Sequence, residues 1–303
     1  MSALLRLLAA LALVTAAGCA GTGGSPPRVV VTTDILGDVT RAVVGDQAEV
    51  SVLMKPDSDP HSFGVSAQEA ALIESAGLIV GNGLGLEEGV LRNVEAARRA
   101  GVPVLAVAER TDPITFTADE TAGRPDPHFW TDPRRVATAV DLIAEQVVAH
   151  VDGVDAAAVR ASAAAYRREV ERLDAWVGGQ VATVPPEARR LVTNHHVFGY
   201  FARRYGFEVV GAVIPSGTTL ASPSASDLKS LSDAIRRTGV KAIFADSAQP
   251  DRLARVLASE AGVDVKVVPL FSESLSRRSP GAATYLEMVR SNTKAMVDGL
   301  NGR

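Results

Sequence analysis

The sequence predicts an α/β protein of two lobes, each a parallel β-sheet flanked by helices, joined by a long rigid backbone helix. Three observations lead to this fold class. Short apolar segments alternate with amphipathic helical segments in the first half of the chain, and the same alternation restarts after residue 185. Between the halves, residues 154–184 contain no proline and are rich in strong helix formers. At about 1.5 Å per residue such a helix is roughly 40 Å long, more than one small domain needs.

The first lobe is expected over residues 29–153. Each apolar strand segment in it is followed by a helical segment, which indicates parallel strands. Ser66 and Glu69 have the spacing of a capping box and open one of the helices. The expected strands are 29–33, 49–54, 78–80 and 102–107, and the expected helices are 35–44, 66–75, 87–100 and 132–151.

The second lobe is expected over residues 185–303, after the linking helix at 154–184. Strands and helices alternate here in the same way, and Ser224 and Asp227 open a helix. The expected strands are 190–193, 208–212, 242–245 and 265–268, and the expected helices are 228–238, 251–261 and 282–300. Two lobes of this kind form a cleft between the ends of their strands.

The chain begins like a precursor. Arg6 precedes an apolar run that is too short to span a bilayer and that ends shortly before Cys19. The pattern resembles a bacterial lipoprotein signal, although such signals more often carry leucine at the position of Ala16. It predicts a signal peptide at 1–18 and a flexible tether at 19–28, lipid-anchored to the membrane through Cys19. The alternative is an ordinary secretory signal cut near Cys19, which would leave a periplasmic protein; both alternatives place the protein outside the cytoplasm.

Composition excludes several classes of protein. Cys19 is the only cysteine, so the mature chain has no disulfide and its stability comes from burial of apolar surface. The net charge of −4 is mild and no basic stripe is present, which argues against a nucleic-acid partner. No transmembrane run follows the N-terminal segment. We expect a monomer.

Three of the five histidines lie in short motifs that indicate a metal site. His61 and His128 each follow an Asp-Pro pair, and His195 lies directly after an expected strand. Neutral imidazole is the commonest nitrogen ligand of transition metals. Each of the three lies beyond the carboxyl end of a strand, where open parallel sheets bind their ligands. Since two belong to the first lobe and one to the second, the predicted metal lies in the cleft between the lobes.

A carboxylate is expected to complete the site. Three neutral imidazoles need a fourth, anionic ligand to form a tetrahedral site around a dication. Glu273 follows the last strand of the second lobe, and Asp246 follows the strand before it. Both are candidates from their position alone.

Other patterns have simpler interpretations. The run from Gly81 to Gly85 imitates a dinucleotide-binding fingerprint, but the third glycine of that fingerprint is missing, so a supporting loop is the better interpretation. His150 lies inside an expected helix and is taken as structural. Phe198, Tyr200 and Phe201 have helical spacing and are expected in the core rather than on a substrate platform.

Taken together, the motifs resemble the zinc/manganese-binding solute receptors of metal ABC transporters. They occur in order over nearly the whole mature chain, which makes the set far more specific than any one motif. The motifs are Asp59-Pro60-His61, Asn82-Gly83-Leu84-Gly85-Leu86-Glu87, Asp126-Pro127-His128-Phe129-Trp130, His195-x-x-Phe198-x-Tyr200, Phe271-x-Glu273-Ser274-Leu275 and Tyr285-Leu286-Glu287.

The resemblance implies a function, a ligand set and a partner. It makes His61, His128, His195 and Glu273 the ligands of a captured divalent metal, which the protein delivers to an ABC-transporter permease. Zinc is expected rather than manganese, because three imidazoles and one carboxylate suit a borderline metal better than a hard one. The chain departs from the family in using glutamate where aspartate is usual, and in the short, histidine-free loop 112–125.

Two function classes compete with a metal receptor. A zinc hydrolase would keep one coordination position open for water, whereas four protein ligands close the site, and no His-Glu-x-x-His or Gly-x-Ser-x-Gly motif is present. A lipoprotein that serves only in cell adhesion would not require the histidine set. We therefore predict a metal receptor that is not an enzyme.

Overall fold

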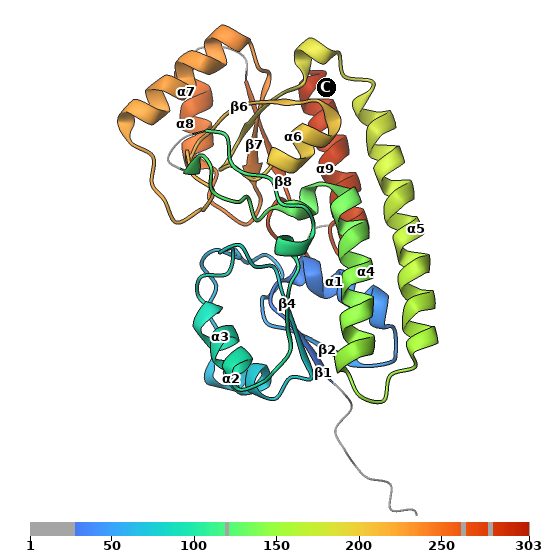
Figure 1. The fold of residues 1–303 in the computed structure, drawn as a ribbon. Helices are drawn as coiled ribbons and strands as arrows, with labels where there is room; N and C mark the ends of the chain where they lie inside the picture. The colour runs from blue at the N-terminus through green and yellow to red at the C-terminus, as the bar shows by residue number, and fades with distance from the viewer. Residues whose placement is uncertain (1–27, 119–120, 262–264, 278–280, 303) are drawn as a thin grey trace, which may run out of the picture.

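The structure is a computed structural model that describes residues 28–118, 121–261, 265–277 and 281–302, and it shows two lobes stacked along one long helix (Figure 1). Each lobe contains a four-stranded parallel sheet. The first sheet has the order β2-β1-β3-β4 and the second the order β6-β5-β7-β8, so the two lobes repeat one topology. The predicted fold class is confirmed.

The N-terminal sheet is built on two strands that are covered on both faces. Val29, Val30 and Val31 of β1 and all four residues of β3 are buried, as expected for central parallel strands. The strands are β1 (Arg28–Val31), β2 (Glu49–Val52), β3 (Leu78–Gly81) and β4 (Val104–Ala106), and the helices are α1 (Asp34–Val44), α2 (Ala67–Glu74) and α3 (Leu91–Arg99). The predicted capping box of Ser66 and Glu69 is present.

The C-terminal sheet is covered in the same way. Its strands are β5 (Arg190–Thr193), β6 (Glu208–Ala212), β7 (Ala242–Asp246) and β8 (Lys266–Leu270), and its helices are α6 (Gly199–Tyr205), α7 (Ala225–Thr238), α8 (Arg252–Glu260) and α9 (Tyr285–Leu300). The capping box of Ser224 and Asp227 opens α7. The sequence pattern did not delimit α6, a helix of 7 residues that begins without a side-chain cap.

Two consecutive helices connect the lobes. α4 (Pro133–His150) begins with Asp132 as N-cap and Pro133 in the first turn, and α5 (Ala156–Val181) begins with Asp155 as N-cap. α5 has 26 residues, or about 39 Å at the usual helical rise, and runs beside both lobes (Figure 1). Its buried side chains recur every three or four residues, which places them on one face. They are Val159, Ala163, Tyr166, Val170, Leu173, Val177 and Val181.

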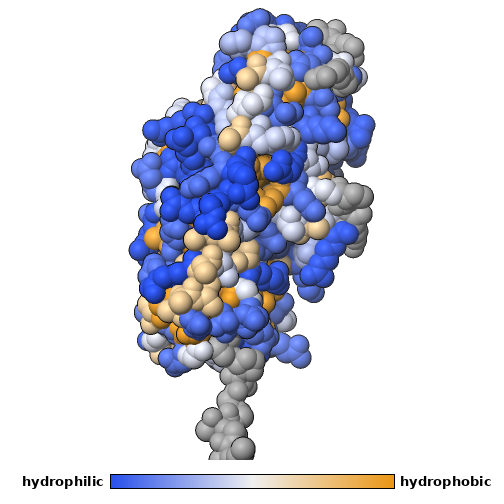
Figure 2. Space-filling view, turned by 90° about the vertical axis from the view of Figure 1, so that its right-hand side faces the viewer, coloured by the Kyte–Doolittle hydropathy of each residue, from blue (hydrophilic) through white to orange (hydrophobic). Residues whose placement is uncertain are grey.

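The outer side of this helix pair is exposed. Arg160 of α5 forms an ion pair with Glu145 of α4, and Arg167 forms one with Asp141. Figure 2 views the molecule from this side and shows mostly hydrophilic side chains, with an apolar patch in the lower half. Within the described part of the chain, no helix is long and apolar enough to cross a membrane.

One apolar core runs through both lobes, and we call this large cluster the joining core. It includes side chains of α1, α4 and α5, and continues through α6, β7 and α9 without interruption. Two smaller clusters lie apart from it: one under α2 and α3, the other under α7 and α8. The two lobes are therefore joined by the packed side chains of the joining core as well as by the covalent connection through α4 and α5.

Candidate metal centre

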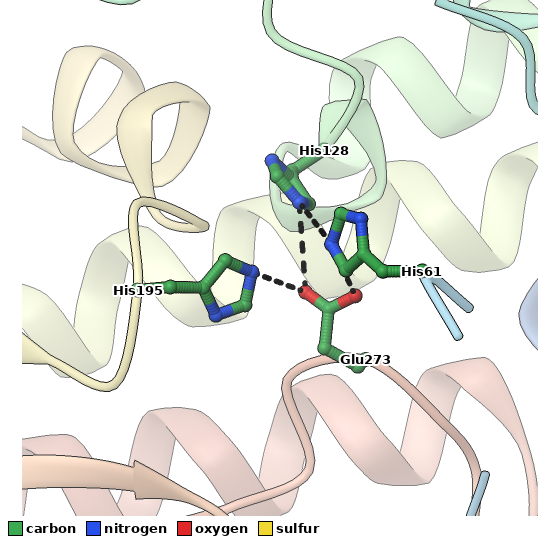
Figure 3. Close-up of side chains that lie close together, drawn as sticks. All are labelled: His61, His128, His195 and Glu273. Carbon is green, nitrogen blue, oxygen red and sulfur yellow. Dashed lines mark hydrogen bonds and ion pairs between the residues drawn. The ribbon is translucent and has the colours of Figure 1, made fainter. Parts of the chain in front are cut away.

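Four side chains from distant parts of the chain converge between the lobes (Figure 3). His61 lies on the loop after β2 and His128 on the loop between β4 and α4, while His195 follows β5 and Glu273 follows β8. Each comes from the carboxyl end of a sheet, where the sequence placed it. One nitrogen of each histidine and one oxygen of Glu273 lie within 4.8 Å of one another.

The distances fit a tetrahedral metal site. Nε2 of His61 lies 3.4 Å from Nε2 of His128, and Nε2 of His195 lies 3.3 Å from Oε1 of Glu273. Glu273 also lies 3.6 Å from His61 and 3.7 Å from His128. In a tetrahedron with metal–ligand distances of about 2.1 Å, ligand atoms are about 3.4 Å apart. The spacing of the four groups therefore suits a central cation.

The four groups are buried, and several of their polar atoms lack hydrogen bonds. His128 and His195 are 0% exposed, and His61 and Glu273 are 2% exposed. Neither ring nitrogen of His195 and neither oxygen of Glu273 has a hydrogen-bond partner among the described residues. A buried carboxylate without hydrogen bonds is unfavourable, so this arrangement indicates that a ligand supplies the missing interactions.

The charges of Glu273 and His61 are those that a cation needs. Burial opposes ionisation of Glu273, but the neighbouring histidines, His128 and His195 foremost, outweigh it and lower its pKa to about 2. Burial lowers the pKa of His61 to about 3, against the attraction of Glu273. For His128 burial acts in the same direction, yet the carboxylates of Glu273 and Asp126 outweigh it and raise its pKa. Glu273 is thus an anion, and His61 is a neutral imidazole with a free lone pair.

Both Asp-Pro-His motifs use their aspartate in the same way. Oδ1 of Asp59 accepts a hydrogen bond from the backbone N–H of His61, and Oδ1 of Asp126 accepts one from the backbone N–H of His128, each at 2.9 Å. Such Asx-turns fix the backbone two residues further on. Asp126 also lies 2.7 Å from Nδ1 of His128, which leaves Nε2 of that ring to face the centre. Sequence reasoning missed these roles, although the repeated aspartate was their signal.

The glycine-rich loop after β3 supports the second histidine. The carboxylate of Glu87 accepts hydrogen bonds from the backbone N–H groups of Asn82 and Gly83 at 2.7 and 3.1 Å. The side chain of Asn82 then donates to the carbonyl of Pro127 at 3.0 Å. The loop thereby positions the residue just before His128. The helix predicted from residue 87 begins later, at Leu91, after a turn at residues 88–90.

The other candidate carboxylate, Asp246, lies outside the group of four converging side chains. Asp246 is buried at the end of β7, and its pKa is raised to about 6 by burial and by the charge of Glu273. It accepts hydrogen bonds from the hydroxyl of Ser272 and from the backbone N–H of Ala248. It is not one of the four converging groups. Asp246 supports the loop that carries Glu273.

The remaining histidines lie elsewhere. His196 is half-buried and lines a separate cavity of about 630 Å³ between the loop at 114–118 and the sheet of the C-terminal lobe. His150 is exposed at the end of α4. Phe198 and Tyr200 belong to the joining core, as expected. The structure thus brings together the four residues predicted as ligands.

Comparison with known proteins finds similarity to metal-binding components of ABC transporters. The family model described as "Zinc-uptake complex component A periplasmic" (ZnuA) matches residues 29–299. The manganese-binding lipoprotein MntA of Halalkalibacterium halodurans is 28% identical over 292 residues, which cover 94% of each chain. The metal ABC transporter substrate-binding lipoprotein FimA of Streptococcus parasanguinis is 26% identical over 90% of this chain and 89% of its own.

The zinc-binding protein TroA of Treponema pallidum is similar in both sequence and structure. Its sequence is 30% identical over 90% of this chain and 89% of its own. Its structure superposes with a TM-score of 0.83, and the match covers 91% of this chain and 99% of that one. The similarity therefore includes both lobes.

Proposed function

The chain belongs to the ZnuA family of metal-binding, substrate-binding proteins of ABC transporters, and we propose that it captures zinc with His61, His128, His195 and Glu273. Proteins of this family are substrate-binding proteins and not enzymes. The metal is the transported substrate. We propose that the permease of the transporter receives it after a change in the geometry of the site.

The observation that carries the ligand assignment is the convergence of four buried donor groups, two of which, His195 and Glu273, have side-chain atoms without a hydrogen-bond partner among the described residues. His61, His128 and His195 each offer one nitrogen, and Glu273 offers one carboxylate oxygen. Four protein ligands fill a tetrahedral shell, which suits retention of a metal rather than activation of a bound water. All four come from one chain, so a monomer contains the complete site.

The donor set, not the comparison, supports zinc. One relative is named for zinc and another for manganese, so membership of the family does not select the metal. Imidazole is a borderline ligand that suits zinc, whereas manganese prefers carboxylate, carbonyl and water oxygens. A site with three nitrogens and one carboxylate therefore favours zinc.

Competitive titration tests this choice. We expect protein stripped of metal to bind Zn²⁺ at least about 100-fold more tightly than Mn²⁺, as the order of divalent-metal affinities implies for a nitrogen-rich site. Elemental analysis of protein purified without added metal should find zinc in near-stoichiometric amount. Equal affinity for the two metals, or tighter binding of Mn²⁺, would contradict the proposal while leaving the receptor class intact.

We also propose that the lobes divide as predicted, at 29–153 and 185–303, with 154–184 as the linking helix. The described helix α5 spans Ala156–Val181, within that link. It packs against α1 and α4 and also against α9 of the C-terminal lobe, so it contacts both lobes.

Cys19 lies outside the described residues, and its role as lipid anchor is a proposal that rests on the sequence and on relatives named as lipoproteins. We expect Cys19→Ser to move the protein from the membrane fraction to the soluble extracytoplasmic fraction without changing its metal affinity, since the four proposed ligands all lie far along the chain from residue 19. Cell fractionation and a zinc titration of the purified variant check both parts. A wild-type protein found only in the soluble fraction would argue for an ordinary secretory signal instead.

A further inference from the structure

The buried centre poses a problem of access. The four donor side chains are at most 2% exposed, so a metal ion cannot pass between solvent and the centre unless part of the surrounding structure moves. The joining core runs continuously through both lobes, which opposes their separation as rigid bodies. The movement must therefore be local to one of the segments that carry the donors.

Three of the four segments that carry a donor side chain have neighbouring residues packed in the joining core. His128 is followed by Phe129 and Trp130, and His195 by Val197 and Phe198, all of which belong to that core. Glu273 lies between core residues at 270 and 275. Hydrogen bonds reinforce this attachment at Glu273, where the carboxylate of Asp34 in the opposite lobe accepts from the hydroxyl of Ser274 and the backbone N–H of Leu275 at 2.7 and 2.9 Å.

The segment that carries His61 is attached differently. No residue from 53 to 66 belongs to the joining core, and Phe63 packs instead against the small cluster under α2 and α3. Towards the other lobe the segment makes polar contacts: the backbone N–H of Asp57 donates to the carbonyl of Leu275 at 2.9 Å. Two further hydrogen bonds with that lobe are made by one side chain, that of Asp59, and His61 itself lies 3.6 Å from Glu273.

The carboxylate of Asp59 joins the two lobes over the centre. Its Oδ1 accepts the backbone N–H of His61, while its Oδ2 accepts from the hydroxyl of Thr219 at 2.6 Å and from the side-chain amide of Gln249 at 2.9 Å. Thr219 lies on the loop between β6 and α7, and Gln249 on the loop between β7 and α8. The hydrogen bonds from Thr219 and Gln249 to the Asp59 carboxylate are both lost when the segment moves outwards.

We propose that Asp59 is a latch: its bonds to Thr219 and Gln249 hold the segment 55–63 over the centre and set the rate at which the metal leaves. In this arrangement His61 is the first donor to leave the metal, while His128, His195 and Glu273 stay in place on the joining core. This inference rests on the proposed metal-binding function. Asp59 acts through His61 and is a positioning residue rather than a ligand.

The test removes the partners of the latch and leaves the donors alone. In Thr219→Val and Gln249→Leu the bond from His61 to Asp59 is intact, and in Asp59→Ser the short hydroxyl can still accept that N–H but cannot reach the other lobe. Thr238→Val is the matched control, because the hydroxyl of Thr238 donates to the carbonyl of Ala234 at 2.7 Å in α7, far from the centre in the chain. The measured quantities are the rate of Zn²⁺ release to an excess of chelator in a stopped-flow instrument and the thermal midpoint of the metal-free protein.

We expect each of the three latch variants to release Zn²⁺ about tenfold faster than the wild type, with a larger effect in the Thr219→Val, Gln249→Leu double variant. The control should release Zn²⁺ at the wild-type rate. The thermal midpoints of the metal-free variants should equal that of the metal-free wild type. Unchanged release from the double variant, or equal acceleration by the control, would overturn the latch. A wild type that binds neither Zn²⁺ nor Mn²⁺ would instead refute the proposed function, so the two failures are distinguishable.

Discussion

His195→Ala removes most of the zinc affinity of the protein, whereas His196→Ala leaves it nearly unchanged: this is the result we expect from the pair of adjacent histidines. Nε2 of His195 lies 3.3 Å from Oε1 of Glu273, and the His195 side chain is completely buried. The ring of His196 is half-buried and lines the separate cavity beside the loop at 114–118. Both histidines lie in the bend after β5, and only His195 is among the four converging groups, so we expect one metal not to use both.

The expected loss of zinc affinity in His195→Ala follows from the share of the binding free energy that one of the four ligands contributes. Structural zinc sites contribute about 10–16 kcal/mol, so one of four ligands accounts for roughly 3 kcal/mol, or a factor of about 100 in the dissociation constant. Competition against a chelator of known affinity measures the loss, and far-ultraviolet circular dichroism should show both variants folded. If His196→Ala abolishes binding and His195→Ala is silent, the ligand assignment is displaced by one residue. If neither matters, the C-terminal lobe contributes no histidine to the site.

Local patterns were enough to predict the alternation of strands and helices, because burial and capping leave signals within a few residues. The capping boxes at Ser66 and Ser224 were visible in this way and are present. The ligand histidines could be predicted for a related reason: each lies on a loop beyond the carboxyl end of a strand, and the ends of parallel strands meet at one edge. Short α6 has no side-chain cap and so gave no comparable signal.

The supporting contacts could not be predicted, because they join residues far apart in the chain. Asn82 holds the carbonyl of Pro127, and Asp59 reaches Thr219, a residue 160 positions later. The sequence around either partner contains no pattern that would predict such a long-range hydrogen bond. The choice between the two candidate carboxylates likewise depended on the fold, since both follow strands of the same sheet. The family resemblance selected Glu273, and the structure puts that carboxylate, not Asp246, among the histidine rings.

The assignment of Glu273 rather than Asp246 as the anionic ligand predicts the second large loss of zinc affinity. We expect Glu273→Gln to weaken zinc binding at least as strongly as His195→Ala, and Asp246→Asn to weaken it much less. Glutamine keeps the shape of the side chain but removes the only negative charge among the four donors, which leaves a dication surrounded by neutral ligands in a buried site. Removing one partner of a buried charge pair costs about 3–5 kcal/mol, or roughly 100- to 4000-fold in affinity.

Asp246→Asn is the matched control because it makes the same chemical change at the rival carboxylate. Asparagine retains an oxygen that can accept from the hydroxyl of Ser272 or the backbone N–H of Ala248, so the loop that carries Glu273 keeps part of its support. Loss of such a supporting contact lowers metal affinity by about 10- to 100-fold at most. Titration of both variants with Zn²⁺ under the same conditions ranks them. If Asp246→Asn abolishes binding while Glu273→Gln retains it, Asp246 is the anionic ligand, and the loop after β8 must rearrange when the metal binds.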